Sequence, residues 1–104
     1  MKLQGQVAIV TAAGRGIGKG IALALATEGA RLVVNSFSEK TLANTVDAIK
    51  ELGAEVISLS GDITDPLKMI ALRDLALSEY GQIDILVNNV GAGPEQSEKP
   101  PEHE

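Results

Sequence analysis

Three glycines at alternate positions, Gly14, Gly16 and Gly18, follow a short apolar run and have the spacing of a ligand-binding turn. Glycine lets a backbone come close to a phosphate, and the first N–H groups of a following helix point at it with the positive end of the helix dipole. The residues beyond Gly16 have helical apolar spacing. We therefore predict a phosphate cradle formed by residues 14–18, namely Gly14, Arg15, Gly16, Ile17 and Gly18. An ordinary strand-to-helix connection is the alternative.

Further candidate groups follow two other apolar segments of the chain. Ser36 follows residues 31–35, and Asp62 and Ile63 follow residues 55–60. In a parallel sheet, groups that follow neighbouring strands gather at the carboxyl edge, where nucleotides bind. A carboxylate there can accept a hydrogen bond from an exocyclic amine, and a backbone N–H can reach a ring nitrogen. Alternatively, Asp62 is a turn residue that bonds its own backbone.

Short apolar strands and helices alternate along the chain and must position these groups. Strands are predicted at 7–10, 31–35, 55–60 and 83–87, with a helix between each pair. The third helix has a clear start, because Asp65 is an N-cap acceptor and Pro66 lacks an N–H that would have had no helical partner. Four strands alternating with three helices predict an α/β fold with a parallel sheet and right-handed crossovers.

The glycine turn resembles the T-G-x-x-x-G-x-G cofactor motif of the short-chain dehydrogenase/reductase family. The chain carries it as residues 11–18, with Ala12 in place of the first glycine. The alanine methyl fits if the backbone at Ala12 keeps a negative φ. The strict dinucleotide pattern G-x-G-x-x-G is not met, because its third glycine would fall on Lys19.

Two later segments strengthen the resemblance, which covers residues 5–91. Asp62-Ile63-Thr64 resembles the family's D-[IV]-[ST] adenine site, and residues 88–91 resemble its N-N-A-G segment with Val90 for alanine. The family pattern implies that Asp62 and Ile63 contact the adenine. It likewise implies that the backbone of the second segment contacts the cofactor ribose, through Asn89, Val90 and Gly91. A structural role for the two asparagines is an equal alternative, since buried amides need several partners.

The resemblance implies the amino-terminal half of a Rossmann-like, doubly wound domain, with four parallel strands in the order 3-2-1-4 and three helices. We place this partial NAD(P)-binding domain at residues 1–92. Residues 93–104 combine proline and glutamate without large apolar side chains, which predicts a disordered acidic tail. The fourth strand would present an open edge, and one face of the sheet would lack a helix. A missing neighbour or a partner chain would cover both this edge and the third helix, which is apolar on all sides. Alternatively, this small helix simply leaves some of its leucines exposed.

The residues that carry out the family's hydride transfer, a Ser and a Tyr-x-x-x-Lys, have no counterpart here. Tyr80 is the only tyrosine, and Asp84 stands where the lysine would be. We assign no catalytic residue and expect a segment truncated before the family's catalytic residues, inactive alone in the family's hydride transfer between NAD(P)(H) and a hydroxyl or carbonyl. Two alternatives stay open: a non-catalytic nucleotide-binding module, and an interaction module that pairs through its open edge with itself or with a complementary chain.

The cofactor preference follows from the charges expected near the ribose. An acid after the second strand would accept a hydrogen bond from a 2′-hydroxyl, whereas a 2′-phosphate needs a cation. Residues 35–37 contain no acid and Arg15 lies in the cradle, so the sequence favours NADP over NAD. Alternatively, Arg15 interacts only with solvent or with a surface acid.

Composition excludes several other classes of function. The net charge is −5 and the nine basic residues are scattered, which argues against a nucleic-acid or anionic membrane surface. The absence of cysteine excludes thiolate metal sites and favours a reducing cytoplasm. No residues have metal-ligand spacing, and His103 is isolated. The longest apolar run, residues 21–26, is too short to cross a bilayer, so we predict a cytoplasmic protein.

Overall fold

The computed structural model describes residues 1–89, in which strands and helices alternate as predicted. The elements are β1 (Val7–Val10), α1 (Gly16–Thr27), β2 (Arg31–Ser36), α2 (Glu39–Glu51), β3 (Val56–Ser60), α3 (Pro66–Tyr80) and β4 (Ile85–Val87). β4 begins two residues later than the sequence indicated, and the other strand ends agree within one residue. The predicted domain boundary at residue 92 and the tail at 93–104 lie outside the described residues.

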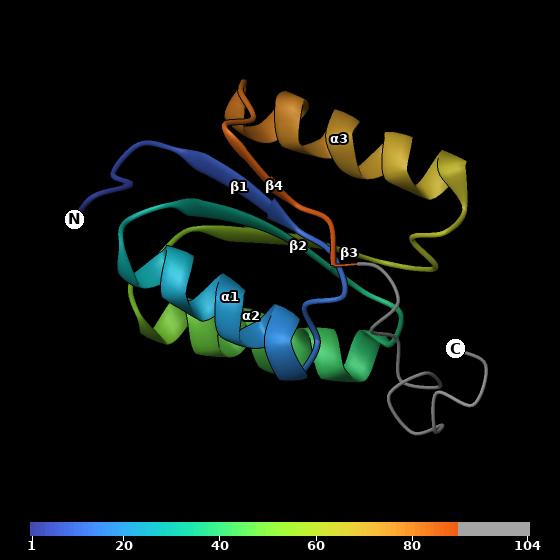
Figure 1. Cartoon of the computed structure of the whole chain (residues 1–104), viewed down its shortest axis with the longest axis horizontal. Helices are drawn as coiled ribbons and strands as arrows, with labels where there is room; N and C mark the ends of the chain where they lie inside the picture. Colours follow the sequence, from blue (N-terminus) through green and yellow to red (C-terminus); the bar gives the residue numbers. More distant parts are fainter. Residues whose placement is uncertain (90–104) are drawn as a thin grey trace.

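The four strands form one parallel sheet in the order β3-β2-β1-β4, which confirms the predicted topology (Figure 1). All four residues of β1 are buried, as expected of a central strand that is covered on both faces. Its last residue, Val10, pairs with Val34 and Val87. The turns that follow β1 and β2 and the segment that follows β4 therefore lie together at the carboxyl edge of the sheet.

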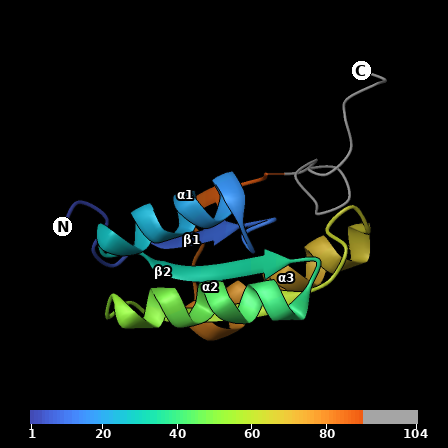
Figure 2. The same cartoon turned by 90° about the horizontal axis from the view of Figure 1, so that it is seen from below.

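Helices cover the two faces unequally. α1 and α2 lie side by side on one face, and α3 is the one helix of residues 1–89 on the other (Figures 1 and 2). Ala22 and Ala26 of α1 are buried among side chains of β1 and β2, and their small size lets the helix lie close to the sheet. On the opposite face, Leu72 and Ala76 of α3 pack on Ile9.

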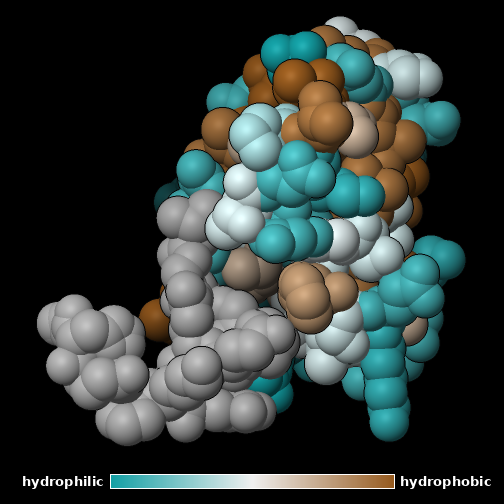
Figure 3. All heavy atoms as spheres, turned by 90° about the vertical axis from the view of Figure 1, so that its right-hand side faces the viewer, coloured by the Kyte–Doolittle hydropathy of each residue, from teal (hydrophilic) through white to brown (hydrophobic). Residues whose placement is uncertain are grey.

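The face that carries α3 is incompletely covered. α3 packs on β1 and β2, and among the described residues no helix packs over β4 on that side. The side chain of Leu86 in β4 is consequently 51% exposed. On α3 itself, Leu67, Ile70 and Leu77 face solvent, and apolar side chains gather over this helix in Figure 3. None of the helices among residues 1–89 has the length and apolar composition needed to cross a membrane.

A carboxylate fastens β4 to the start of β1 at the amino edge of the sheet. Asp84 Oδ2 accepts hydrogen bonds from the Val7 backbone N–H, at 2.8 Å, and from Gln82 Nε2, at 2.6 Å. The Asp84 N–H donates to the Val7 carbonyl at 2.9 Å. These donors stabilise the charged carboxylate, and the bond from Val7 makes the largest contribution to lowering the pKa of Asp84.

We expect Asp84→Asn to lower the free energy of unfolding at pH 7 and to leave it nearly unchanged at acidic pH. A carboxyl group whose pKa is lower in the folded than in the unfolded chain stabilises the fold above its unfolded pKa, and this stabilisation is lost as pH falls through the folded pKa. Urea unfolding at several pH values between about 7 and 3 measures the difference. Asp47→Asn, on the exposed face of α2, is the matched control. An equal deficit for Asp84→Asn at every pH would contradict the assignment.

Candidate nucleotide-binding site

The amino terminus of α1 is open to solvent and has no side-chain cap. Ser38 caps α2 by accepting a bond from Thr41 N–H, and Asp65 caps α3 by accepting one from Leu67 N–H. The N-cap residue of α1 is Arg15, which has extended backbone angles. Its side chain makes no capping hydrogen bond to the helix. Residues 15–17 are exposed. The first N–H groups of α1, which have no partner within the helix, together with the helix dipole therefore face a region that an anion can enter.

Two glycines of the turn are places of close backbone approach. A Cβ built on Gly18 would overlap the carbonyl oxygen of Ala12 and would lie 2.8 Å from Asn89 Nδ2. A Cβ on Gly14 would overlap Ser36 Oγ, which lies at the end of the neighbouring strand. Gly16 differs from both, because nothing lies within 4 Å of its added Cβ but its φ is +64°. Gly16 is therefore required by its backbone angle, and Gly14 and Gly18 by their lack of a side chain.

The backbone at Ala12 contradicts the expectation of a negative φ. Its φ is +51°, and among the described residues it is the one non-glycine residue with a positive φ. The chain must reverse here so that the Ala13 N–H can donate to the Asn35 carbonyl, at 2.6 Å, while the Ala12 carbonyl turns toward Gly18. A Cβ in this left-handed region is sterically unfavourable, so the alanine is held there under strain by its neighbours.

Buried polar residues that the sequence analysis missed hold the glycine turn in place. Thr45 Oγ1 in α2 lies 2.9 Å from the Ala13 carbonyl and 3.2 Å from the Gly14 carbonyl. Asn35 accepts a bond from Ala12 N–H at 3.4 Å and donates from Nδ2 to the Leu59 carbonyl at 3.0 Å. Both side chains are buried. A polar residue inside an apolar strand was a usable signal for Asn35, whereas Thr45 gave no comparable signal.

Ser36 lies where it was predicted but is already engaged. It is buried at the end of β2, and its Oγ is 3.2 Å from Thr41 Oγ1. The next residue, Phe37, is 55% exposed at the same edge. Ser36 thus borders the cradle through its contact with Gly14 and directs its hydroxyl toward α2.

In the turn after β3, Asp62 accepts a hydrogen bond from the backbone of its own turn, which was the alternative considered for this residue. Asp62 Oδ1 accepts hydrogen bonds from Thr64 Oγ1, at 2.6 Å, and from Thr64 N–H, at 3.0 Å. These bonds, the hydroxyl first, lower the pKa of Asp62 and keep it charged at neutral pH. The residue is exposed, so the same carboxylate can also face a ligand at this edge. Ile63 is half-buried against the apolar cluster beneath α3.

Thr11 joins the end of β4 to the glycine turn. The Asn89 N–H donates to Thr11 Oγ1 at 2.8 Å, and this hydroxyl lies 3.4 Å from the Val87 carbonyl. Asn89 Nδ2 is buried beside Gly18 and has no hydrogen-bond partner within residues 1–89. A buried donor of this kind needs an acceptor, and a ligand that enters the cradle can supply one. Val90 and Gly91, the other two predicted ribose contacts, lie outside the described residues.

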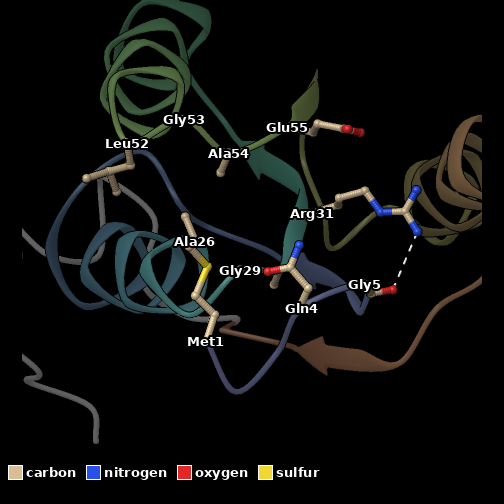
Figure 4. A pocket seen from close by; sticks show the side chains of 11 residues that line it. Met1, Gln4, Gly5, Ala26, Gly29, Arg31, Leu52, Gly53, Ala54 and Glu55 are labelled. Carbon is tan, nitrogen blue, oxygen red and sulfur yellow. Dashed lines mark hydrogen bonds between the residues drawn. The ribbon is translucent and has the colours of Figure 1, made fainter.

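The amino edge of the sheet carries a surface hollow and a tyrosine beside an arginine. A hollow of about 320 Å³ lies there, with Met1, Gln4 and Leu52 among its lining residues (Figure 4). Tyr80 is at the same edge, with the Arg31 guanidinium 5.0 Å from the centre of its ring. Burial is the main cause that raises the pKa of Tyr80. Within residues 1–89, no group of three or more His, Cys, Asp or Glu side chains could hold a metal ion.

Comparison with known proteins gives consistent similarities. A family model described as "short chain dehydrogenase" matches residues 6–104. The chain is 44% identical over 93 residues to 7alpha-hydroxysteroid dehydrogenase of Escherichia coli K12, a match that covers 89% of this chain and 36% of that protein. It is 48% identical over 91 residues to elsinochrome reductase 1 of Elsinoe fawcettii, covering 86% and 34% respectively. The chain thus spans about a third of the length of these relatives.

Solved structures agree with the sequence matches. The fold matches a 7α-hydroxysteroid dehydrogenase complexed with NADH and 7-oxo glycochenodeoxycholic acid, with a TM-score of 0.80 and 44% identity. This match covers 84% of the present chain and 34% of the solved one. A hydroxysteroid dehydrogenase from Escherichia coli gives the same TM-score and identity, with coverage of 84% and 37%.

We expect Gly18→Ala to lower the free energy of unfolding by about 2–3 kcal/mol, because its methyl would overlap a backbone carbonyl that cannot move independently. Gly20→Ala, two residues later in α1, is the matched control, since nothing lies within 4 Å of the added Cβ. This control should raise stability by about 0.5–1 kcal/mol through helix propensity. Urea unfolding measures both changes. A Gly18→Ala variant as stable as Gly20→Ala would show that α1 does not approach the turn this closely.

Proposed function

The chain belongs to the short-chain dehydrogenase family, and from this membership we propose that its glycine turn and the first turn of α1 bind the pyrophosphate of a nicotinamide dinucleotide. The family is one of oxidoreductases, and a solved relative is complexed with NADH. The observation that carries the proposal is the uncapped α1 terminus beside three glycines, two of which have no room for a side chain. Gly14, Arg15, Gly16, Ile17 and Gly18 form this cradle.

The remaining contacts of the dinucleotide are assigned from the same edge of the sheet. Following the family pattern, we propose that the adenine contacts Asp62 and Ile63 and that the ribose contacts Asn89, Val90 and Gly91. Asn89 Nδ2, which has no hydrogen-bond partner within residues 1–89, supports a polar ligand group nearby. Ser36 contributes by its position next to Gly14. We also propose a preference for NADP over NAD, supported by Arg15 at the N-cap of α1.

The reaction of the whole protein is a further proposal, because the chain spans about a third of its relatives. When bound, the dinucleotide supplies or accepts a hydride, and the family reaction moves it between the cofactor and a hydroxyl or carbonyl substrate. Within this reaction the present residues bind and orient the cofactor. No catalytic residue is assigned to them, and we propose that residues 1–104 alone do not turn over substrate. A domain boundary at residue 92 and a cytoplasmic location remain proposals from composition.

Titration of NADPH and NADH against the 104-residue chain, followed by cofactor fluorescence, tests the cradle. We expect saturable binding that Gly16→Val weakens by about tenfold or more, since its side chain would stand where the phosphate approaches. Gly53→Val is the matched control: Gly53 also has a positive φ (+83°) and open space, but it lies at the opposite edge of the sheet. Absence of saturable binding by the folded chain, or equal weakening by both variants, would contradict the proposal.

A second candidate function is association through the open edge of β4, and it is favoured by the uncovered face beside that strand. Leu86 is 51% exposed, and the apolar side of α3 is exposed on the same face. An unpaired strand edge next to exposed apolar side chains is a template for pairing with another chain. We propose that a second copy of this chain, or a complementary chain, pairs there.

We expect the 10.8 kDa chain to elute from gel filtration as a dimer at micromolar concentration. Leu86→Lys should shift it to the monomer, because a charged side chain at a strand edge opposes pairing. Leu52→Lys is the control. Leu52 has the same 51% exposure, but it lines the hollow at the amino edge of the sheet and is not part of β4. A compact monomer at all concentrations would rule out pairing with a second copy of this chain.

A further inference from the structure

We propose that Lys68 and Glu39 set the cofactor preference of this site with opposite signs: Lys68 attracts the 2′-phosphate of NADP(H), and Glu39 repels it. The inference rests on the proposed dinucleotide function and adds two residues that sequence position does not mark. Lys68 comes from the first turn of α3 and Glu39 from the first turn of α2. Both reach the carboxyl edge of the sheet between β2 and β3.

The side chain of Lys68 lies over Gly61, the glycine that follows β3. A Cβ built on Gly61 would overlap Lys68 Cε and would lie 2.9 Å from both Cδ and Nζ. The φ of Gly61 is +142°, so glycine is favoured here by its backbone as well as by the lysine above it. Within residues 1–89, the Lys68 ammonium makes no hydrogen bond or ion pair. The charge is therefore available at this edge to a ligand.

Gly61 is hydrogen-bonded to the last two residues of β2. Its N–H donates to the Ser36 carbonyl at 3.0 Å, and its own carbonyl accepts from Asn35 Nδ2 at 3.2 Å. Ser36 stands about 20 residues after the glycine turn, at the position where a dinucleotide-binding sheet meets the adenosine ribose. The Lys68 ammonium above Gly61 is thus adjacent to the place where a 2′-hydroxyl or a 2′-phosphate would lie.

Glu39 brings a negative charge to the same place. Its Oε2 accepts a hydrogen bond from Ser60 Oγ at 3.4 Å, and Ser60 pairs with Ser36 in the sheet. The sequence argument for NADP relied on the absence of acid at positions 35–37, but this carboxylate reaches the strand ends from position 39. A carboxylate there can accept a hydrogen bond from a 2′-hydroxyl and opposes a 2′-phosphate. The preference therefore depends on the balance between these two side chains as well as on Arg15.

Only NADP(H) carries the additional phosphate charge, so removing either side-chain charge should change the affinity for NADPH more than the affinity for NADH. An exposed charge pair contributes up to about 1 kcal/mol, which corresponds to about a fivefold change in Kd. Salt screens such pairs with a Debye length of about 10 Å at 0.1 M. The difference between the two cofactors should therefore shrink at high ionic strength.

The test is fluorescence titration of NADPH and NADH with Lys68→Gln, Glu39→Gln and the control Lys50→Gln, which lies in the last turn of α2 at the opposite edge. We expect Lys68→Gln to raise the Kd of NADPH about fivefold and Glu39→Gln to lower it about two- to fivefold, with the Kd of NADH changed less than about twofold. Lys50→Gln should change neither. Repeating the titrations at about 0.5 M salt should reduce both NADPH effects.

The outcomes separate this inference from the function on which it rests. Binding of NADH by Lys68→Gln shows that the variant is folded and that its cradle is intact. If the unmodified chain binds both cofactors but Lys68→Gln and Glu39→Gln leave the ratio of the two Kd values unchanged, the inference is wrong and the proposed function stands. If the unmodified chain binds neither cofactor, the proposed function and the inference both fail.

Discussion

The close approach of α1 to the end of β1 is the constraint on which the rest of the site depends. The Cα of Gly18 packs against the Ala12 carbonyl with no room for a side chain, and this contact fixes where the first turn of the helix points. The approach is accompanied by a positive φ at Ala12, an unfavourable conformation for a residue with a Cβ. Buried bonds from Asn35 and Thr45 hold the backbone in that conformation, so strain at one residue is offset by polar contacts from two neighbouring elements.

The carboxyl edge of the sheet contrasts with the amino edge in how its polar groups are satisfied. At the amino edge, Asp84 and its donors close the start of β1 with short hydrogen bonds. At the carboxyl edge, Thr11 and Asn35 satisfy much of the backbone, while the first turn of α1 has no side-chain cap and Asn89 Nδ2 has no hydrogen-bond partner among the described residues. Buried or converging polar groups are normally paired, so these two exceptions at one edge are the physical reason for considering a ligand site there.

The face of the sheet that carries α3 differs from the carboxyl edge, because its exposed groups are apolar and not polar. α3 shields β1 and β2 but leaves Leu86 exposed, and its own outer side carries Leu67 and Ile70 toward solvent. Exposed apolar groups that adjoin an open strand edge are unfavourable in water and favour further association. Relatives about three times as long have additional chain with which to cover such a surface. The exposed face is therefore explained separately from the candidate ligand site.

The sequence by itself determined the elements, the strand order and the position of the glycine turn. Apolar periodicity and the glycine, proline and N-cap signals act locally, and the family resemblance supplied the order of the strands. Only the tertiary structure decided the rest: the strained angle at Ala12, the engagement of Ser36 by Thr41, and the reach of Lys68 and Glu39 to the carboxyl ends of β2 and β3. These features depend on distances between residues far apart in the chain or on neighbouring elements, and such distances arise from packing that no local pattern encodes.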